Sequence, residues 1–327
     1  MRPKVYIAWR IPDEIEAYLA EHCSLRKWKG ETPIRYEELK DELKDAEGLL
    51  LGEGRIDAEL LEQAPHLRVV STISNGYNNL DIEAMKHRGV IGTNNPGISN
   101  ESVADLVLGL ALAAARKIVK LDRYVKEGCW TRGIDSSWYG LDVHHSTIGI
   151  IGMGGIGQEV AKRAKAGFDM KVLYYNRSRR PEVEHRLGAE YCSLEELLTQ
   201  SDFIVVMLPL TAQTEHLIGD RHFDLMKPSA VLINASRGSI VNERALVEAL
   251  RARKISAAAL DVYEFEPVNP DHPLLNMDNV ITLPHVGSAT AKTRFNMVMS
   301  AARNLVAALK GETPPFLIRE FKESVQN

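Results

Sequence analysis

Three glycines, Gly152, Gly154 and Gly157, constrain the fold of this chain more than any other feature. The apolar run 147–151 before them is typical of a buried parallel strand, and residues 156–167 after them have a helical pattern. In such a unit the first glycine permits a tight turn, the second lets backbone approach a pyrophosphate, and the third lets the helix pack closely on the strand. The spacing predicts a dinucleotide-binding α/β unit, and the alternative is a glycine-rich turn without a ligand.

The strand expected at 171–175 leads into a basic turn where a carboxylate commonly binds the ribose of the dinucleotide, about 20 residues past the glycines. An amide, a hydroxyl and three guanidinium groups stand there instead: Asn176, Arg177, Ser178, Arg179 and Arg180. Guanidinium groups match phosphate oxygens, which a carboxylate would repel. The turn therefore predicts that NADPH is preferred and leaves NADH possible; the alternative is a solvated basic turn.

The chain has 327 residues, more than one hydrophobic core usually spans, so we expect two domains. Strand-like and helical runs alternate, a single long helix is expected from about Ser99 to Gly128, and six or so parallel strands follow it. We expect two Rossmann-like α/β domains. A doubly wound, parallel-sheet nucleotide-binding domain (99–287) is inserted in a smaller, discontinuous flavodoxin-like substrate domain (1–98 and 288–327).

Charge and cysteine content exclude several classes of function. A net charge of −4 with mixed signs argues against a nucleic-acid-binding surface. Cys23, Cys129 and Cys192 are too far apart for a disulfide framework or a zinc site, and the N-terminus lacks the apolar core of a signal peptide. The most apolar helical run, 103–115, is too short to span a membrane. We therefore predict a cytoplasmic protein that binds no metal, nucleic acid or membrane.

Three polar side chains follow three successive predicted strands of the nucleotide-binding domain: Arg237, Glu266 and His285. Ligands of such sheets bind at the carboxyl ends of the strands. Hydride delivery to a carbonyl carbon needs a proton donor for the oxygen, and His285 suits that role. Glu266 would keep the imidazole charged and oriented, and Arg237 could bind a carboxylate with both ends of its guanidinium group. Each residue alone also has an ordinary structural explanation.

Together with the glycine segment, these residues resemble the D-isomer-specific 2-hydroxyacid dehydrogenases, and the resemblance covers essentially the whole chain. More closely, the segment 138–145 and the glycine segment resemble the bacterial glyoxylate and hydroxypyruvate reductases, also called 2-ketogluconate reductases. The resemblance implies that His285 donates the proton, Glu266 partners it, and Arg237 binds the substrate. It implies that Asp261 faces the nicotinamide amide, and that cofactor contacts also come from Gly154, Gly155, Ile156, Pro209, Ala235, His285 and Gly287.

The family resemblance also implies a substrate-binding loop in the first domain. Its backbone N–H groups at Asn75 and Gly76 would bind the substrate carboxylate, with Ser288 nearby. Asn75 stands where the family usually has valine, which leaves the identity of the substrate open. The expected activity is reduction of a small 2-oxo acid, such as glyoxylate, hydroxypyruvate or 2-ketogluconate, to a D-2-hydroxy acid. Relatives are homodimers, and the alternative function is an NAD(P)-sensing protein that resembles the corepressors of this fold.

Overall fold

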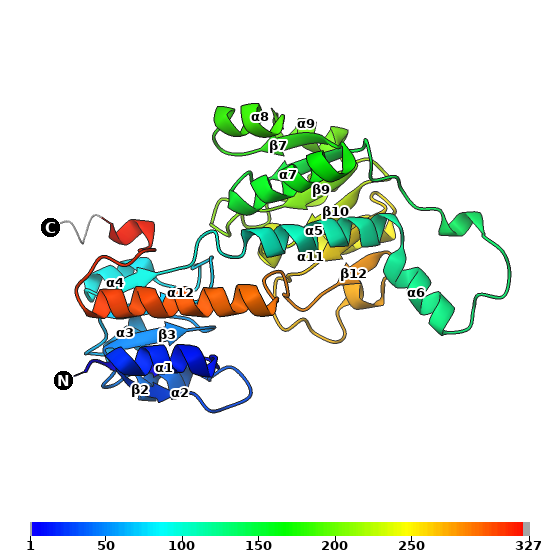
Figure 1. Ribbon diagram of the computed structural model, residues 1–327. Coiled ribbons are helices and arrows are strands. Elements are labelled where there is room, and N and C mark those ends of the chain that lie inside the picture. Colours follow the sequence, from blue (N-terminus) through cyan, green and yellow to red (C-terminus); the bar gives the residue numbers. More distant parts are fainter. Residues whose placement is uncertain (1, 323–327) are drawn as a thin grey trace. The chain divides into compact units, whose positions relative to one another are not determined.

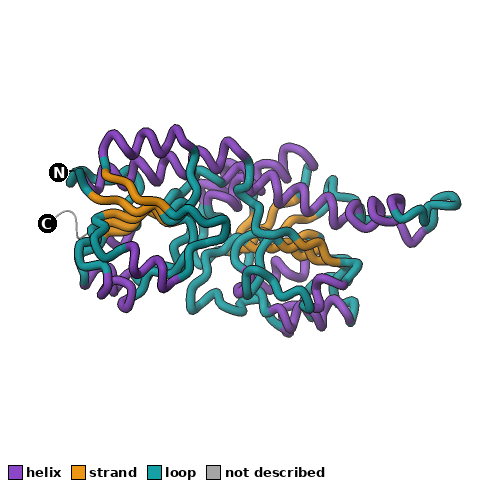
Figure 2. The backbone as a smooth tube through the Cα atoms, turned by 90° about the horizontal axis from the view of Figure 1, so that it is seen from below, coloured by secondary structure: helices purple, strands orange, loops and turns teal. Residues whose placement is uncertain are grey.

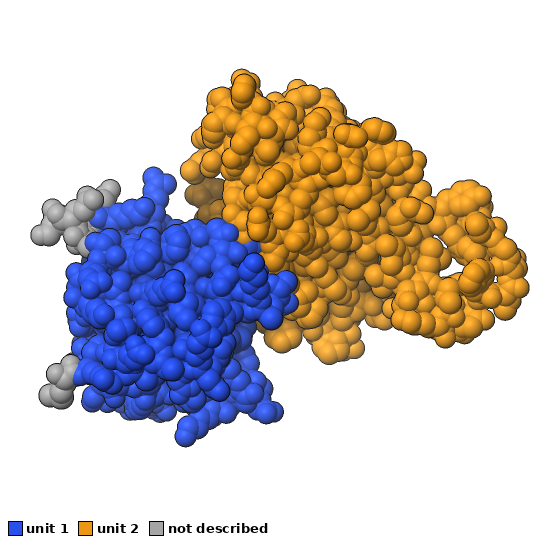
Figure 3. All heavy atoms as spheres, in the orientation of Figure 1, with its two compact units in different colours: residues 1–99, 289–327 blue, residues 100–288 orange. Residues whose placement is uncertain are grey.

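The protein is described by a computed structural model that covers residues 2–322. The chain forms two compact units, one from residues up to Ser99 together with those from Ala289 onward, the other from Asn100–Ser288 (Figure 3). These divisions lie one residue from the expected boundaries. In each unit the strands form one layer between helices (Figure 2).

The unit that contains both ends of the chain is built on a five-stranded parallel sheet with the order β2-β1-β3-β4-β5, the flavodoxin-like order. Its elements are β1 (Lys4–Ile7), α1 (Asp13–His22), β2 (Ser24–Lys27), α2 (Tyr36–Glu42), β3 (Gly48–Leu51), α3 (Ala58–Gln63), β4 (Val69–Thr72), α4 (Ile82–His87), β5 (Ile91–Thr93), α12 (Ala291–Leu309) and η4 (Arg319–Phe321). Apolar side chains alternate along the strands, so α1 and α12 cover one face while α2, α3 and α4 cover the other (Figure 1).

The second unit contains a seven-stranded parallel sheet with the order β12-β11-β10-β9-β6-β7-β8. Its elements are α5 (Asn100–Ala115), α6 (Ile118–Lys126), η1 (Ser136–Trp138), β6 (Thr147–Ile151), α7 (Gly155–Phe168), β7 (Lys171–Tyr175), α8 (Pro181–Leu187), β8 (Glu190–Tyr191), α9 (Leu194–Gln200), β9 (Phe203–Val206), α10 (Asp220–Phe223), β10 (Val231–Asn234), η2 (Gly238–Ile240), α11 (Glu243–Arg251), β11 (Ala257–Leu260), η3 (Pro273–Asn276) and β12 (Val280–Thr282). The order reverses between β6 and β9, which is the switch point where doubly wound sheets bind dinucleotides.

The sequence did not predict two edge strands that the structure contains, β2 and β8. All four residues of β2 and both residues of β8 are exposed or only half-buried. They therefore carry neither the continuous apolar run of a buried strand nor a clear alternation. The nucleotide-binding unit consequently has seven strands rather than about six.

The single helix expected from Ser99 to Gly128 is wrong, because the structure has two helices there. Lys117 adopts a left-handed backbone conformation with φ 54°, which ends α5 and starts α6 in a new direction. The helix α5 buries seven side chains against the sheet, whereas α6 buries none. No glycine or proline lies at the break, so the local sequence did not predict where the buried helix ends and the exposed helix begins.

Candidate active site

The glycine loop between β6 and α7 has the geometry that a dinucleotide needs. Gly152 has φ 111°, and a Cβ there would lie 2.4 Å from the Met207 carbonyl oxygen. A Cβ on Gly157 would lie 2.2 Å from the carbonyl oxygen of Gly152, so helix and turn could not approach as they do. By contrast, a Cβ on Gly154 would meet no atom within 4 Å. The first and third glycines are thus required by the fold, and the second borders open space.

The N-terminus of α7 faces that space. Gly154 is its N-cap residue and provides no side-chain hydrogen bond to the first turn, so this 14-residue helix starts without a side-chain cap. Gly155 and Ile156 are its first two residues, exposed and half-buried respectively. Uncapped N–H groups and the positive end of the helix dipole fit a pyrophosphate.

The basic turn after β7 is partly used by the protein itself. Asn176 accepts a hydrogen bond from the Met153 N–H through Oδ1 at 2.7 Å, which ties the end of β7 to the glycine loop. Arg179 binds Glu184 through Nε and Nη2, at 2.8 Å and 2.7 Å, and Glu184 also accepts the Tyr174 hydroxyl. These contacts lower the pKa of Glu184 to about 2. The exposed side chains of the turn thus include Arg177 and Arg180, whereas Arg179 is held by a carboxylate.

His285 and Glu266 form a close pair at the carboxyl edge of the same sheet. The Nδ1 atom of His285 lies 2.6 Å from Oε2 of Glu266, and the other oxygen, Oε1, accepts the Tyr263 N–H at 3.0 Å. Burial raises the pKa of Glu266, but His285, the Tyr263 N–H and the charge of Arg237 together bring this pKa below its usual value. The His285 side chain is 48% exposed, so the ring is not closed off from a ligand.

The backbone around His285 is held in an unusual conformation. His285 has φ 52°, in the left-handed region that few non-glycine residues adopt. Asp261, almost fully buried after β11, accepts the N–H groups of Val286 at 2.7 Å and Gly287 at 2.8 Å. Burial raises the pKa of Asp261, and the two N–H groups oppose this rise. Asp261 therefore orients the His285 segment, a role that sequence reasoning missed.

Arg237 lies in the loop after β10 and is half-buried. Its Nη1 donates to the carbonyl oxygen of Ser236 at 2.7 Å. Burial lowers the pKa of Arg237, and the nearby negative charge of Glu266 opposes this effect. Asn234, the buried last residue of β10, shapes the loop by donating to the Arg237 carbonyl oxygen at 3.0 Å and accepting the Ser236 N–H at 3.1 Å. A polar residue ending an apolar strand was the available sequence signal for Asn234.

Three predicted contact residues occupy the same edge of this unit. Pro209 follows β9, Ala235 follows β10, and Gly287 follows the His285 segment. A Cβ on Gly287 would lie 3.1 Å from Oδ2 of Asp261, so a larger residue would crowd that carboxylate. Ser288 is the last residue of the unit. Their roles as ligand contacts stay predictions.

The predicted substrate loop lies in the other unit, after β4. The Asn75 carbonyl oxygen accepts the Asn94 side-chain amide at 2.7 Å, and the Gly76 carbonyl oxygen accepts the Ser74 hydroxyl at 2.7 Å. These contacts fix the orientation of the peptide groups on either side of Gly76. Binding of a substrate carboxylate by the N–H groups of Asn75 and Gly76 stays a prediction.

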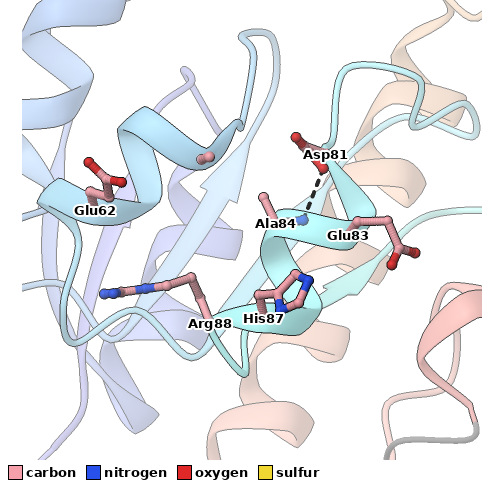
Figure 4. Close-up of a pocket in the computed structure, with 7 residues that line it drawn as sticks. Glu62, Asp81, Glu83, Ala84, His87 and Arg88 are labelled. Carbon is pink, nitrogen blue, oxygen red and sulfur yellow. Dashed lines mark hydrogen bonds between the residues drawn. The ribbon is translucent and has the colours of Figure 1, made fainter.

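A surface pocket of this same unit contains none of the predicted site residues. It lies between α3 and α4 and is lined by Ala58, Glu62, Asp81, Glu83, Ala84, His87 and Arg88 (Figure 4). Asp81 is engaged as the N-cap of α4, where it accepts the Ala84 N–H at 3.0 Å. Within residues 2–322, no group of His, Cys, Asp or Glu is arranged to bind a metal ion. Nor does any helix in that range have the length and apolarity to cross a bilayer.

Comparison with known proteins identifies the family. The model of the D-isomer specific 2-hydroxyacid dehydrogenase NAD binding domain matches residues 108–287. Glyoxylate/hydroxypyruvate reductase B of Erwinia tasmaniensis is 46% identical over 312 residues, which cover 95% of this chain and 97% of that protein.

Solved structures give the same result. A glyoxylate reductase from Paecilomyes thermophila superposes with a TM-score of 0.87 at 31% identity, covering 98% of this chain and 99% of that one. An NADPH-dependent glyoxylate/hydroxypyruvate reductase from Sinorhizobium meliloti, in complex with NADP and malonate, has a TM-score of 0.86 at 30% identity, with 98% of both chains covered. The chain belongs to the D-isomer specific 2-hydroxyacid dehydrogenases and is a nicotinamide-dependent oxidoreductase.

Proposed function

We propose that the protein is an NADPH-preferring reductase that converts small 2-oxo acids into D-2-hydroxy acids. Glyoxylate, hydroxypyruvate and 2-ketogluconate are the candidate substrates. One observation carries the proposal: His285 and Glu266 are 2.6 Å apart at the carboxyl edge of the sheet that also bears the glycine loop. Carbonyl reduction by a nicotinamide needs a general acid near the cofactor, and an imidazole oriented by a carboxylate can serve as that acid. The relatives at 46% identity are named glyoxylate/hydroxypyruvate reductase B, which supports the first two of these substrates.

The residues of the site divide the reaction between them. The glycine loop and the turn after β7 would hold a reduced nicotinamide dinucleotide, which would supply the hydride for the C2 carbonyl carbon. His285 donates the proton on its Nε2 atom to the carbonyl oxygen. The Glu266 carboxylate, in contact with Nδ1 of His285, stabilises the imidazolium before the proton is transferred and keeps the ring in one orientation. Arg237 binds the substrate carboxylate and polarises the carbonyl with its planar guanidinium group. The family resemblance assigns further substrate contacts to the N–H groups of Asn75 and Gly76 and to the Ser288 side chain.

The preference for NADPH is supported by the charge of the turn after β7. Asn176 replaces the carboxylate that would repel a 2′-phosphate, and the exposed guanidinium groups of Arg177 and Arg180 are available to attract it. Arg179 contributes less, because Glu184 already neutralises it. The S. meliloti relative of known structure is described as NADPH-dependent.

A homodimer formed through the segment 116–142 is part of the proposal. This segment projects from its unit (Figure 1, Figure 3) and carries six of the nine large hydrophobic side chains that are exposed within residues 2–322: Ile118, Val119, Val125, Trp130, Ile134 and Tyr139. Apolar groups concentrated on a protrusion are typical of an interface, and a second copy of the chain is the partner we expect. Sedimentation of the unsubstituted protein and of Ile134→Asp tests this proposal: we expect a dimer for the first and a monomer for the second. An unsubstituted protein that sediments as a monomer would contradict it.

The cysteines support a cytoplasmic location as part of this proposal. Cys23, Cys129 and Cys192 are all free thiols, which suits a reducing compartment.

The direct test is a panel of 2-oxo acids assayed with NADPH and with NADH. We expect turnover with glyoxylate or hydroxypyruvate, a D-configured product, and a higher kcat/KM for NADPH. Tight NADPH binding without turnover of any 2-oxo acid would instead indicate a nucleotide-sensing protein of the same fold.

A further inference from the structure

Two glutamates behind the His285–Glu266 pair clamp each other. The Glu243 N–H donates to Oε1 of Glu264 at 3.0 Å, and the Glu264 N–H donates to Oε1 of Glu243 at 2.8 Å. Glu243 is the first residue of α11, and Glu264 lies in the loop after β11, two residues before Glu266. The reciprocal bonds hold this loop against the start of the helix although they bring two carboxylates together.

Each of the two carboxylates has a histidine partner. Nε2 of His216 lies 2.9 Å from Oε1 of Glu264, and Nε2 of His272 lies 3.2 Å from Oε2 of Glu243. Nδ1 of His272 accepts the Leu274 N–H, so its ring proton is on Nε2 and points at Glu243. The histidines thus offset part of the repulsion between the carboxylates.

The network joins the loops at the carboxyl edge of three neighbouring strands. His216, in the loop after β9, has φ 48° and donates its N–H at 2.7 Å to the carbonyl oxygen of Ser239, two residues after Arg237. A Cβ on Gly238 would lie 1.8 Å from the carbonyl carbon of Tyr263, so the Arg237 loop packs directly on the backbone that precedes Glu264. A left-handed histidine maintained by such contacts is typical of functional loops.

We infer that Glu243, Glu264, His216 and His272 are positioning residues for the reduction: they hold segment 263–266 so that the Glu266 carboxylate meets His285 and stays in register with the Arg237 loop. This inference rests on the proposed function for its catalytic readout. The Glu243–Glu264 hydrogen bonds lie close in the chain to the catalytic pair. The Tyr263 N–H binds Oε1 of Glu266, and the next N–H, that of Glu264, binds Glu243. Burial and the neighbouring charges of Glu264 and Glu266 raise the pKa of Glu243, while the Glu264 N–H and His272 oppose the rise. The clamp is therefore electrostatically costly unless all of its partners are present.

The test compares disruptive and conservative variants in the full-length protein. Glu264→Ala and Glu243→Ala remove the clamp. Glu264→Gln retains an oxygen that can accept both the Glu243 N–H and His216. His216→Ala removes only one partner and is the milder variant if an alanine at 243 or 264 prevents folding. Glu248→Ala, on the exposed side of α11, is the matched control.

We expect kcat to fall about 10- to 100-fold in Glu243→Ala and Glu264→Ala and about fivefold in His216→Ala. Glu264→Gln and Glu248→Ala should stay within about 1.5-fold of the unsubstituted protein, and the Kd for NADPH should stay within about twofold throughout, because the glycine loop is not part of the network. The alkaline limb of the kcat–pH profile should move to lower pH in the alanine variants, since a displaced Glu266 carboxylate stabilises the imidazolium less. A general loss of stability would not move this limb.

A second readout does not depend on turnover. Amide hydrogen exchange of segment 261–267 in the native state should become at least about tenfold faster in the alanine variants and remain unchanged in Glu264→Gln and Glu248→Ala. Unchanged exchange together with an unchanged pH profile in Glu243→Ala and Glu264→Ala would overturn the inference. An unsubstituted protein that turns over no 2-oxo acid would overturn the proposed function, while the exchange data would still decide whether the clamp orders this segment.

Discussion

The Nδ1 atom of His285 lies 2.6 Å from Oε2 of Glu266, although 18 residues separate the two in the chain. The Tyr263 N–H holds Glu266 from one side, and Asp261 holds the residues after His285 from the other. The pair is therefore oriented by backbone contacts before any substrate arrives, which favours proton transfer at Nε2.

Replacing either member of this pair should affect turnover far more than cofactor binding. We expect His285→Ala to lower kcat about 10³-fold and Glu266→Gln about 10- to 100-fold, with the Kd for NADPH changed less than about threefold. Steady-state kinetics and fluorescence titration measure the two quantities, and His144→Ala, an exposed histidine of the same unit, is the control. A near-native kcat for His285→Ala would rule out its role as the acid.

The same pair sets the expected response to acid. The pKa of Glu266 lies below its usual value, so the carboxylate takes up its proton at a lower pH than an ordinary glutamate does. The acid limb of the kcat–pH profile should accordingly lie below about pH 4.3 where the protein remains folded, and it should be absent in Glu266→Gln. An acid limb near pH 6 that survives in Glu266→Gln would assign that limb to another group.

Cofactor choice should respond to charge in the turn after β7. Asn176→Asp retains an oxygen for the Met153 N–H but adds a negative charge beside the 2′-phosphate site. The ratio of kcat/KM for NADPH to that for NADH should drop about 10- to 100-fold in this variant, through charge repulsion, and by a similar factor in Arg177→Ala, through loss of one charge-assisted hydrogen bond. Arg186→Ala, on the exposed side of α8, should leave the ratio unchanged. A constant ratio in all three variants would show that the turn does not select the cofactor.

The glycines should separate folding from binding. Gly157→Ala places a Cβ 2.2 Å from the Gly152 carbonyl oxygen, so we expect a loss of about 2 kcal/mol or more in unfolding free energy. Gly154→Ala, with no atom within 4 Å, should keep the Tm while weakening NADPH binding at least about tenfold. Gly167→Ala, also unobstructed and inside α7, is the control and should stabilise the helix by about 0.5–1 kcal/mol. Thermal melts with and without NADPH distinguish the three outcomes.

Glu184 should make the thermal stability of the protein depend on pH in the acidic range. Its pKa is lowered to about 2, chiefly by Arg179 and then by Tyr174, so its contribution is fully present above the unfolded value of about 4.3 and is lost as the pH falls towards 2. Glu184→Gln should have a lower Tm than the unsubstituted protein at pH 6, and the gap should narrow between pH 4.5 and pH 3. Glu182→Gln, exposed on the same helix, serves as the comparison. A gap that stays constant with pH would mean that the carboxylate charge is not what stabilises the turn.

Local sequence determined the parts of this protein that depend on neighbours along the chain. The glycine spacing and the apolar strands predicted both parallel sheets, because turn conformation and strand burial depend on short segments. The roles assigned to Arg237, Glu266 and His285 stay predictions. The exposed edge strands β2 and β8 and the break at Lys117 escaped prediction, since no apolar pattern or helix-breaking residue marks them.

Only the tertiary structure decided how distant segments share their hydrogen bonds. The carboxylate of Asp261 accepts N–H groups of the His285 loop, and Glu184 forms an ion pair with Arg179. Glu243 accepts the Glu264 N–H. Each of these contacts joins separate loops or helices. Sequence spacing carries no information about which of several acidic residues at one sheet edge will meet which N–H group. That choice is made when packing brings the loops together and every buried polar group must find a partner.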